Sequence, residues 1–163
     1  MANVGDFMAC TEKSTFRTWL PSNTPCPGFE NTSATFKIPQ SRPIEIPVQN
    51  WEVALVEAFV QNTYKNANPT DIGLIYVYTD IIREQRVGNT LASLLRVLQV
   101  GTHEVDEIIH YEFIRPLYCD LAYGHIDTIG IRLRTAAGVP VPFVDNAKVM
   151  MVLEYRAKRH LII

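Results

Sequence analysis

The stretch HIDTIGIRLRT, residues 125–135 of this 163-residue chain, alternates between apolar and polar positions from Ile129 onward. Ile129, Ile131 and Leu133 fall on one side of an extended backbone, and Arg132 and Arg134 fall on the other. Successive side chains of a β-strand point to opposite faces, so this period of two predicts a strand with one buried face. The stretch therefore sets the expectation that the fold is built from β-strands.

Working outward from this stretch, other short segments rich in β-branched and aromatic residues also predict strands. They are residues 16–20, 34–38, 51–60, 75–82, 93–100, 107–113 and 149–156. The second is expected to end at Pro39, and Pro43 and Pro47 are expected to break up the residues that follow. About eight short strands separated by turn signals are typical of an all-β sandwich or barrel.

Residues 51–60, WEVALVEAFV, fit two patterns. Trp51, Leu55 and Phe59 lie one helical turn apart, yet Trp51, Val53, Leu55 and Phe59 also share one face of a strand. The proline and β-branched residues around the segment favour the strand. A single helical turn is expected around residues 62–68.

Length and composition limit the function further. One domain covering residues 1–163 is expected, with residues 1–12 as a possible N-terminal arm. Fifteen basic and 17 acidic residues give a net charge of −2, so any nucleic-acid contact is at most local. The longest aliphatic run, residues 149–153, is far too short for a membrane span. Cys10, Cys26 and Cys119 form no disulfide or zinc pattern, which indicates synthesis in a reducing intracellular compartment.

The residues of an active site do not converge in the sequence. His125 with Asp127, and Glu104 and Asp106 with His110, lack the further ligands of a metal signature. Nucleophile-elbow, phosphate-loop and dinucleotide motifs are missing from the sequence. We therefore expect a protein that is not an enzyme, with no metal and no cofactor. Tyr76 and Tyr78 share one face of a predicted strand. They could serve as core residues, as subunit contacts or as a binding platform.

An ordered series of motifs carries a family resemblance. The quoted motifs are Leu20-Pro21-Ser22-Asn23, Trp51-Glu52-Val53-Ala54-Leu55, Val87-Gly88-Asn89-Thr90, Leu94-Leu95-Arg96-Val97 and Pro140-Val141-Pro142-Phe143. In this order they resemble the penton (minor capsid) proteins of Maverick/Polinton-type elements and adintoviruses. The chain departs from that pattern at Ala54, where the family has glycine, and at residues 146–148, where Asn-Ala-Lys replaces Gly-Lys.

The resemblance implies a single jelly roll: an all-β sandwich of two facing four-stranded antiparallel sheets. It also implies a homopentamer at the vertex of an icosahedral double-stranded DNA capsid, beside a double jelly-roll major capsid protein. The protein would then be part of the virion, after assembly in the nucleus or cytoplasm. The family-motif and candidate assembly residues are Leu20, Pro21, Ser22, Asn23, Trp51, Glu52, Val87, Gly88, Arg96, Pro142 and Phe143.

Two alternatives stay open at this point. One is a jelly-roll binding module, lectin-like or trimeric, without a capsid role. The other concerns residues 51–60 and 149–156, whose two apolar faces suit a subunit contact but also suit burial of both faces within one chain.

Overall fold

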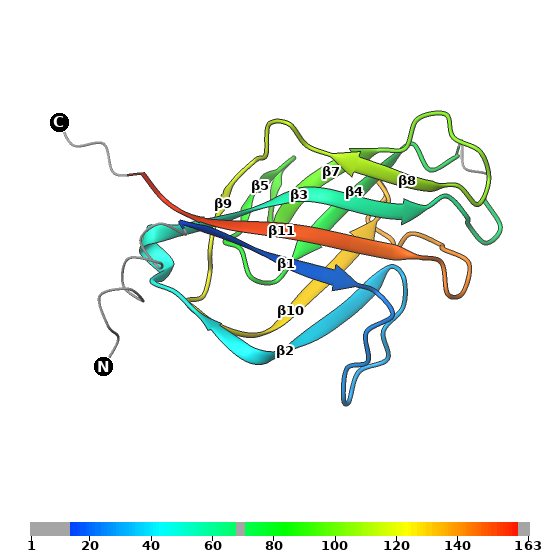
Figure 1. Cartoon of the computed structure of the whole chain (residues 1–163). Helices are drawn as coiled ribbons and strands as arrows, with labels where there is room; N and C mark the ends of the chain where they lie inside the picture. The colour runs from blue at the N-terminus through cyan, green and yellow to red at the C-terminus, as the bar shows by residue number, and fades with distance from the viewer. Residues whose placement is uncertain (1–13, 68–70, 160–163) are drawn as a thin grey trace.

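In a computed structural model that describes residues 14–67 and 71–159, the chain forms two antiparallel sheets facing each other (Figure 1). The first sheet contains, in spatial order, β1 (Thr15–Pro21), β11 (Val149–Ala157), β3 (Trp51–Gln61) and β8 (Ile108–Glu112). The second contains β2 (Thr35–Glu45), β10 (His125–Arg134), β4 (Leu74–Thr79) and β7 (Leu94–Gln99). The short β9 (Cys119–Asp120) pairs with the start of β3, on the same edge as β8.

The pairing is nested from the ends of the chain inward. β1 pairs with β11, β2 with β10, β3 with β8 and β4 with β7, and every pair is antiparallel. Wrapping a long hairpin around a sandwich in this way produces a jelly roll. The predicted fold, a single jelly roll with two facing four-stranded antiparallel sheets, is therefore confirmed.

The core lies between the sheets and consists of the inward-facing side chains of both. Leu55, Leu153 and Tyr155 face it from the first sheet, and Phe36 and Ile131 from the second, each with no exposed surface. Burying one such large apolar side chain contributes about 1.5–3 kcal/mol. The apolar side chains that alternate in residues 125–135, Ile129, Ile131 and Leu133, form the inner face of β10.

A β-bulge in β3 changes which side chains face the core. Val152 of β11 pairs with Glu57 while Leu153 pairs with Leu55, so Val56 is an extra residue between them. Val53 and Leu55 face inward before the bulge, and Ala58 and Val60 do so after it. A bulge shifts the strand by one residue, which reverses its faces. The expectation that Phe59 shares the face of Trp51, Val53 and Leu55 is therefore wrong.

Some predicted boundaries are also wrong. β2 continues through Pro39 and Pro43 to Glu45, since it is an edge strand that pairs only with β10 and proline is tolerated there. β4 ends at Thr79, and the next residues turn away. Residues 62–67 are not helical, and residue 68 lies outside the described residues. The 3-10 turn that the structure describes is η1, Val48–Asn50.

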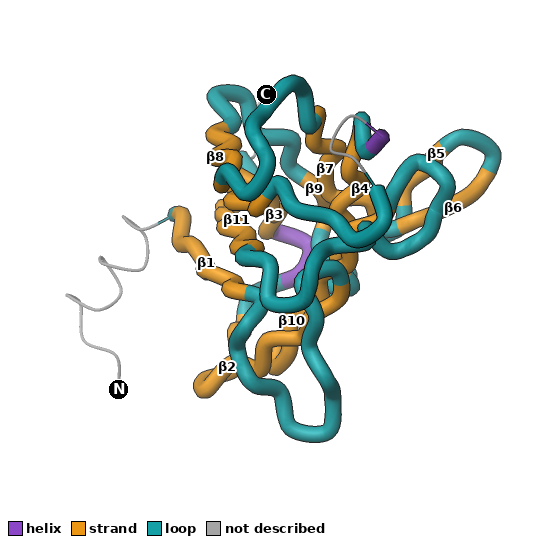
Figure 2. The backbone as a smooth tube through the Cα atoms, turned by 90° about the vertical axis from the view of Figure 1, so that its right-hand side faces the viewer, coloured by secondary structure: helices purple, strands orange, loops and turns teal. Residues whose placement is uncertain are grey.

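The connections between the sheets gather at the two ends of the sandwich. Residues 22–34, 62–67, 71–73, 100–107 and 135–148 form one end, which we call the loop end. The other end carries η1, the chain between β4 and β7, and the chain between β8 and β10. Within it, β5 (Gln85–Val87) and β6 (Thr90–Ala92) form a hairpin that projects from the sandwich in Figure 2. The sequence showed only a turn there.

Candidate assembly surfaces

The outer face of the first sheet is ionic toward the end where β1 begins. Arg17 of β1 reaches across β11, with 3.2 Å between its Nε and Glu154 Oε1 and 3.4 Å between its Nη1 and Glu57 Oε2. His110 of β8 lies 3.0 Å from the other oxygen of Glu57. Arg156 pairs with Glu52 at 2.9 Å. These ion pairs and the contact between His110 and Glu57 join the four strands, and we call this region the ionic half.

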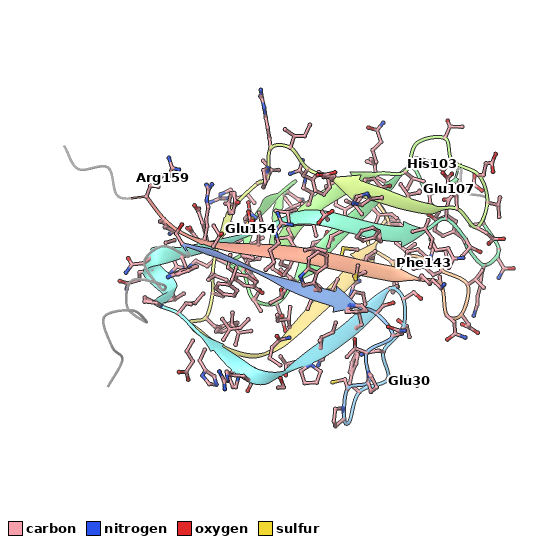
Figure 3. All side chains as sticks on the ribbon, in the orientation of Figure 1. Glu30, His103, Glu107, Phe143, Glu154 and Arg159 are labelled. Carbon is pink, nitrogen blue, oxygen red and sulfur yellow. The ribbon has the colours of Figure 1, made fainter. Side chains whose placement is uncertain are left out.

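Tyr118, from the chain that follows β8, covers part of the ionic half. Its hydroxyl donates a 2.6 Å hydrogen bond to Glu154, which Figure 3 labels near the middle of the sheet. The guanidinium of Arg156 lies 3.4 Å from the centre of its ring. Burial, together with the hydrogen bond to Glu154, raises the pKa of Tyr118, so the phenol stays protonated at neutral pH.

The same outer face is apolar toward the loop end. Pro21, Met150 and Phe59 are aligned in register across β1, β11 and β3, and each is half-buried. Trp19 and Ile108 flank them and are 54% and 46% exposed. Together these five residues form what we call the apolar patch. The outward face of a sheet that meets only water is normally polar, so this patch is a candidate interaction surface.

A groove of about 500 Å³ lies at the loop end of the apolar patch. Its apolar lining includes Pro21, Phe59, Ile108 and Met150, and its rim includes Asn23 and Lys148. A second pocket, beside Cys26 and His125, has a similar volume of about 550 Å³, but its lining is more polar than that of the groove.

Hydrogen bonds between loops hold the wall of the groove in place. The N–H of Ser22 donates to the carbonyl of Val149 at 2.9 Å, and the hydroxyl of Ser33 donates to that of Ala147 at 2.6 Å. Asn31 bonds the backbone of Thr24 and of Lys37. The wall is thus fixed before any partner arrives, which lowers the entropic cost of binding.

Residues 146–148, where the chain departs from the family pattern, lie beside this groove. Asn146 has a φ of 66°, a left-handed conformation that glycine adopts most easily and asparagine tolerates. The turn into β11 therefore forms without glycine. At the other departure, Ala54 is completely buried on the outer side of β3.

The predicted site residues do not form one site. Pro21, Ser22 and Asn23 line the groove, but Leu20 points into the core with no exposed surface. Trp51 packs beside Phe16, with 5.6 Å between the ring centres, and Glu52 belongs to the ionic half.

The remaining predicted residues lie elsewhere. Val87 is the last residue of β5, and Gly88 lies in the turn of the β5–β6 hairpin with a φ of 61°. Phe143 stacks on Tyr64 at the loop end, and the carbonyl of Pro142 accepts a 2.7 Å hydrogen bond from Lys65. These contacts give the two residues a role in joining loops.

Arg96 supports a second exposed apolar surface that the sequence analysis missed. Its guanidinium lies 3.9 Å from the ring centre of Phe113 and donates a 3.1 Å hydrogen bond to the carbonyl of Arg115. Burial lowers the pKa of this guanidinium. The chain held in this way presents Ile114, 93% exposed, and Leu117, 58% exposed. The sequence signal for this second surface is residues 113–117, Phe-Ile-Arg-Pro-Leu, in which proline stands among large apolar residues.

Both strands with two apolar faces use the second face partly within the chain. Ala54, Val56 and Val152 are buried on the outer side, while Phe59 and Met150 remain half-buried in the apolar patch. Burial within the monomer thus accounts for part of each segment. The rest is available for contact.

The two histidines of the sequence clusters each lie beside a glutamate: His125 is 3.0 Å from Glu45 and His110 is 3.0 Å from Glu57. Among residues 14–67 and 71–159, no group of three or more histidine, cysteine or acidic side chains is placed to hold a metal ion. Burial raises the pKa of the Cys119 thiol.

Tyr76 and Tyr78 are not core residues. They are half-buried on the outer face of the second sheet, and the guanidinium of Arg132 lies 5.6 Å from the ring centre of Tyr78. Cys10 and the proposed arm lie outside the described residues. In the part of the chain that the structure describes, no helix is long and apolar enough to cross a membrane.

Comparison with known proteins adds no further constraint. No model of a known protein family matches the chain, and no curated protein matches it either.

Proposed function

We propose that this protein is a structural capsid subunit, the penton of an icosahedral double-stranded DNA virus or virus-like transposon. Five copies form a ring at each vertex, next to a double jelly-roll major capsid protein. The role is mechanical, with no cofactor and no bond made or broken. The protein is made in a reducing compartment, assembles in the nucleus or cytoplasm, and resides in the virion. The motif resemblance and the jelly-roll topology support this proposal.

The observation that carries the proposal is the apolar patch on an otherwise complete sandwich. A second apolar surface, Ile114 with Leu117, follows β8, which forms the edge of the first sheet opposite β1 and Trp19. A closed ring needs heterologous contacts, in which one surface of a copy meets a different surface of the next. Two separate apolar surfaces on one subunit fit that requirement better than the single self-complementary surface of a twofold dimer.

The proposal is tested by expressing the chain alone and together with a double jelly-roll major capsid protein. Native mass spectrometry and negative-stain imaging are expected to show fivefold rings, either free or at the vertices of shells. A chain that stays monomeric over a wide concentration range and joins no shell would contradict the proposal. A threefold oligomer would contradict the fivefold ring and favour a trimeric module.

The groove favours a second candidate function, a lectin-like binding module. Its volume suits a small ligand, and it combines the ring of Phe59 with polar groups of Asn23 and Lys148 at the rim. A glycan array with the purified chain separates the two functions. Saturable binding by a stable monomer, abolished by Phe59→Ala, would favour the lectin-like module.

A further inference from the structure

The groove has the properties of a receptor for a short apolar segment. Pro21, Phe59, Ile108 and Met150 provide its apolar surface, and the strongly exposed Trp19 extends that surface along β1. Side chains of these strands that face the core are almost completely buried, so the patch is not a continuation of the core. The patch is therefore open to an apolar segment that comes from outside this sheet.

The sequence contains a segment of matching chemistry. Residues 160–163 are His-Leu-Ile-Ile, which places three aliphatic side chains in succession after the basic Lys158 and Arg159. Each leucine or isoleucine side chain that leaves water contributes about 1.5–3 kcal/mol when fully buried. Three of them provide an apolar surface that matches the apolar lining of the groove.

We propose that Leu161, Ile162 and Ile163 of one copy dock in the groove of a second copy. This inference rests on the proposed ring, in which such a contact would link each subunit to the next. Each copy carries one segment and one groove, so the contact is heterologous and closes when the last segment meets the first groove.

Geometry excludes docking of the segment in the groove of its own chain. The chain is held at the end of β11 by a 2.7 Å hydrogen bond from the N–H of Lys158 to Asn50 and a 2.8 Å ion pair between Lys158 and Asp120. In Figure 3, Arg159 lies at the end of the sandwich opposite Phe143 and the loop end.

The distance is too long for the segment to return. Ala157 lies seven residue steps along β11 from Met150, a span of about 23 Å at the usual rise of a strand. The four residues after Arg159 reach at most about 14 Å when fully extended. The segment can therefore occupy the groove only of another copy.

Charge also fits this occupant. Glu112 of β8 is exposed on the outer side of the sheet, four residues from Ile108, and has no ion pair within residues 14–67 and 71–159. Arg159 precedes the aliphatic residues, so a docked segment brings the guanidinium of Arg159 toward this carboxylate. Complementary charges at the rim of a contact favour the correct orientation.

The first experiment measures oligomeric mass by light scattering after size-exclusion chromatography. We compare the wild type, a chain that ends at His160, and Ile108→Lys in the groove. Val139→Lys is the matched control, since Val139 is also exposed, at 53%, but lies in the connection between β10 and β11 outside the groove lining. Truncation and Ile108→Lys are expected to convert rings to monomers, while Val139→Lys leaves them intact.

The second experiment detects docking without requiring a ring. It uses the truncated chain with Trp51→Phe, which leaves Trp19 as the sole tryptophan because the sequence has two. Circular dichroism first verifies that this variant is folded. A synthetic peptide with the sequence of residues 156–163 is then added. We expect a saturable blue shift of Trp19 emission, no shift with serine in place of the three aliphatic residues, and about tenfold or greater weakening by Ile108→Lys.

The outcomes separate this inference from the proposed function. Truncated chains that form the same rings as the wild type, or a peptide that causes no shift, would overturn the inference and leave the penton proposal standing. A wild type that assembles into oligomers other than fivefold rings and loses them on truncation, with a peptide that still binds, would remove the penton proposal alone. If deleting residues 1–13 dissolves the rings while deleting residues 161–163 does not, the occupant is the N-terminal segment and the inference is wrong. Displacement of the peptide by a glycan would also count against it.

Discussion

Substitution of Leu153 tests the assignment of inner and outer faces most directly. Leu153 has no exposed surface and lies in β11 between Thr18 of β1 and Leu55 of β3. Leu153→Ala removes buried methyl groups and leaves a cavity, which costs about 2–5 kcal/mol. Leu153→Asp adds an unpaired buried carboxylate, with a further cost of several kcal/mol. A domain's unfolding free energy is about 5–15 kcal/mol, so we expect the aspartate variant to lose its fold.

The assay is urea unfolding followed by circular dichroism. Met150→Asp is the matched control, because it places the same carboxylate in the same strand on the outer face, where water reaches it. We expect Leu153→Ala to unfold at a lower urea concentration and Met150→Asp to remain folded. A folded Leu153→Asp variant with an unchanged midpoint would refute the assignment of this side chain to the core.

Three further predictions concern single positions. Gly124→Ala should lower the unfolding free energy by about 1–3 kcal/mol, since the added Cβ would lie 2.5 Å from the carbonyl oxygen of Ile46. Gly73→Ala, whose added Cβ would meet open space, should leave the unfolding free energy unchanged in the same urea assay. Burial raises the pKa of Tyr64 to about 12. An unfolded phenol titrates near 10, so the unfolded chain loses its proton first, and stability should be intact below pH 10 and fall by up to about 1.4 kcal/mol per pH unit between pH 10 and about pH 12. Tyr64→Phe should remove this contribution from the alkaline unfolding curve, and an unchanged curve would contradict it. Arg96→Ala should lower the unfolding free energy by about 1–2 kcal/mol, because it removes the Phe113 contact and the hydrogen bond to Arg115. Equal stability of the variant and the wild type would show that these contacts contribute nothing.

The sequence predicted the strands well because the inward-facing residues of each strand are apolar, and this pattern can be read in the sequence. The alternation of residues 125–135 became β10, and that of residues 149–156 became β11. Proline was overvalued as a breaker. It ends a strand that pairs on both sides, whereas β2 pairs on one side only, and edge position is a property of the assembled sheet.

The candidate site was predicted only in part. Pro21, Ser22 and Asn23 do line the groove, yet the groove also needs Phe59, Ile108 and Met150 from distant parts of the chain. Phe59 reaches it because the extra residue Val56 reverses the faces of β3. A bulge requires two residues of one strand to oppose one residue of its neighbour, so it appears only when both strands are present.

The amino-acid order by itself determined the class of fold, the number of long strands and most of the residues that fill the core, because backbone geometry ties these features to a period of two. Only the tertiary structure decided which outward side chains meet across β1, β11, β3 and β8, and so where the apolar patch and the ionic half lie. The physical reason is that register between strands far apart in the chain is set by the packing of the whole sandwich, in which a shift of one residue would exchange buried and exposed faces.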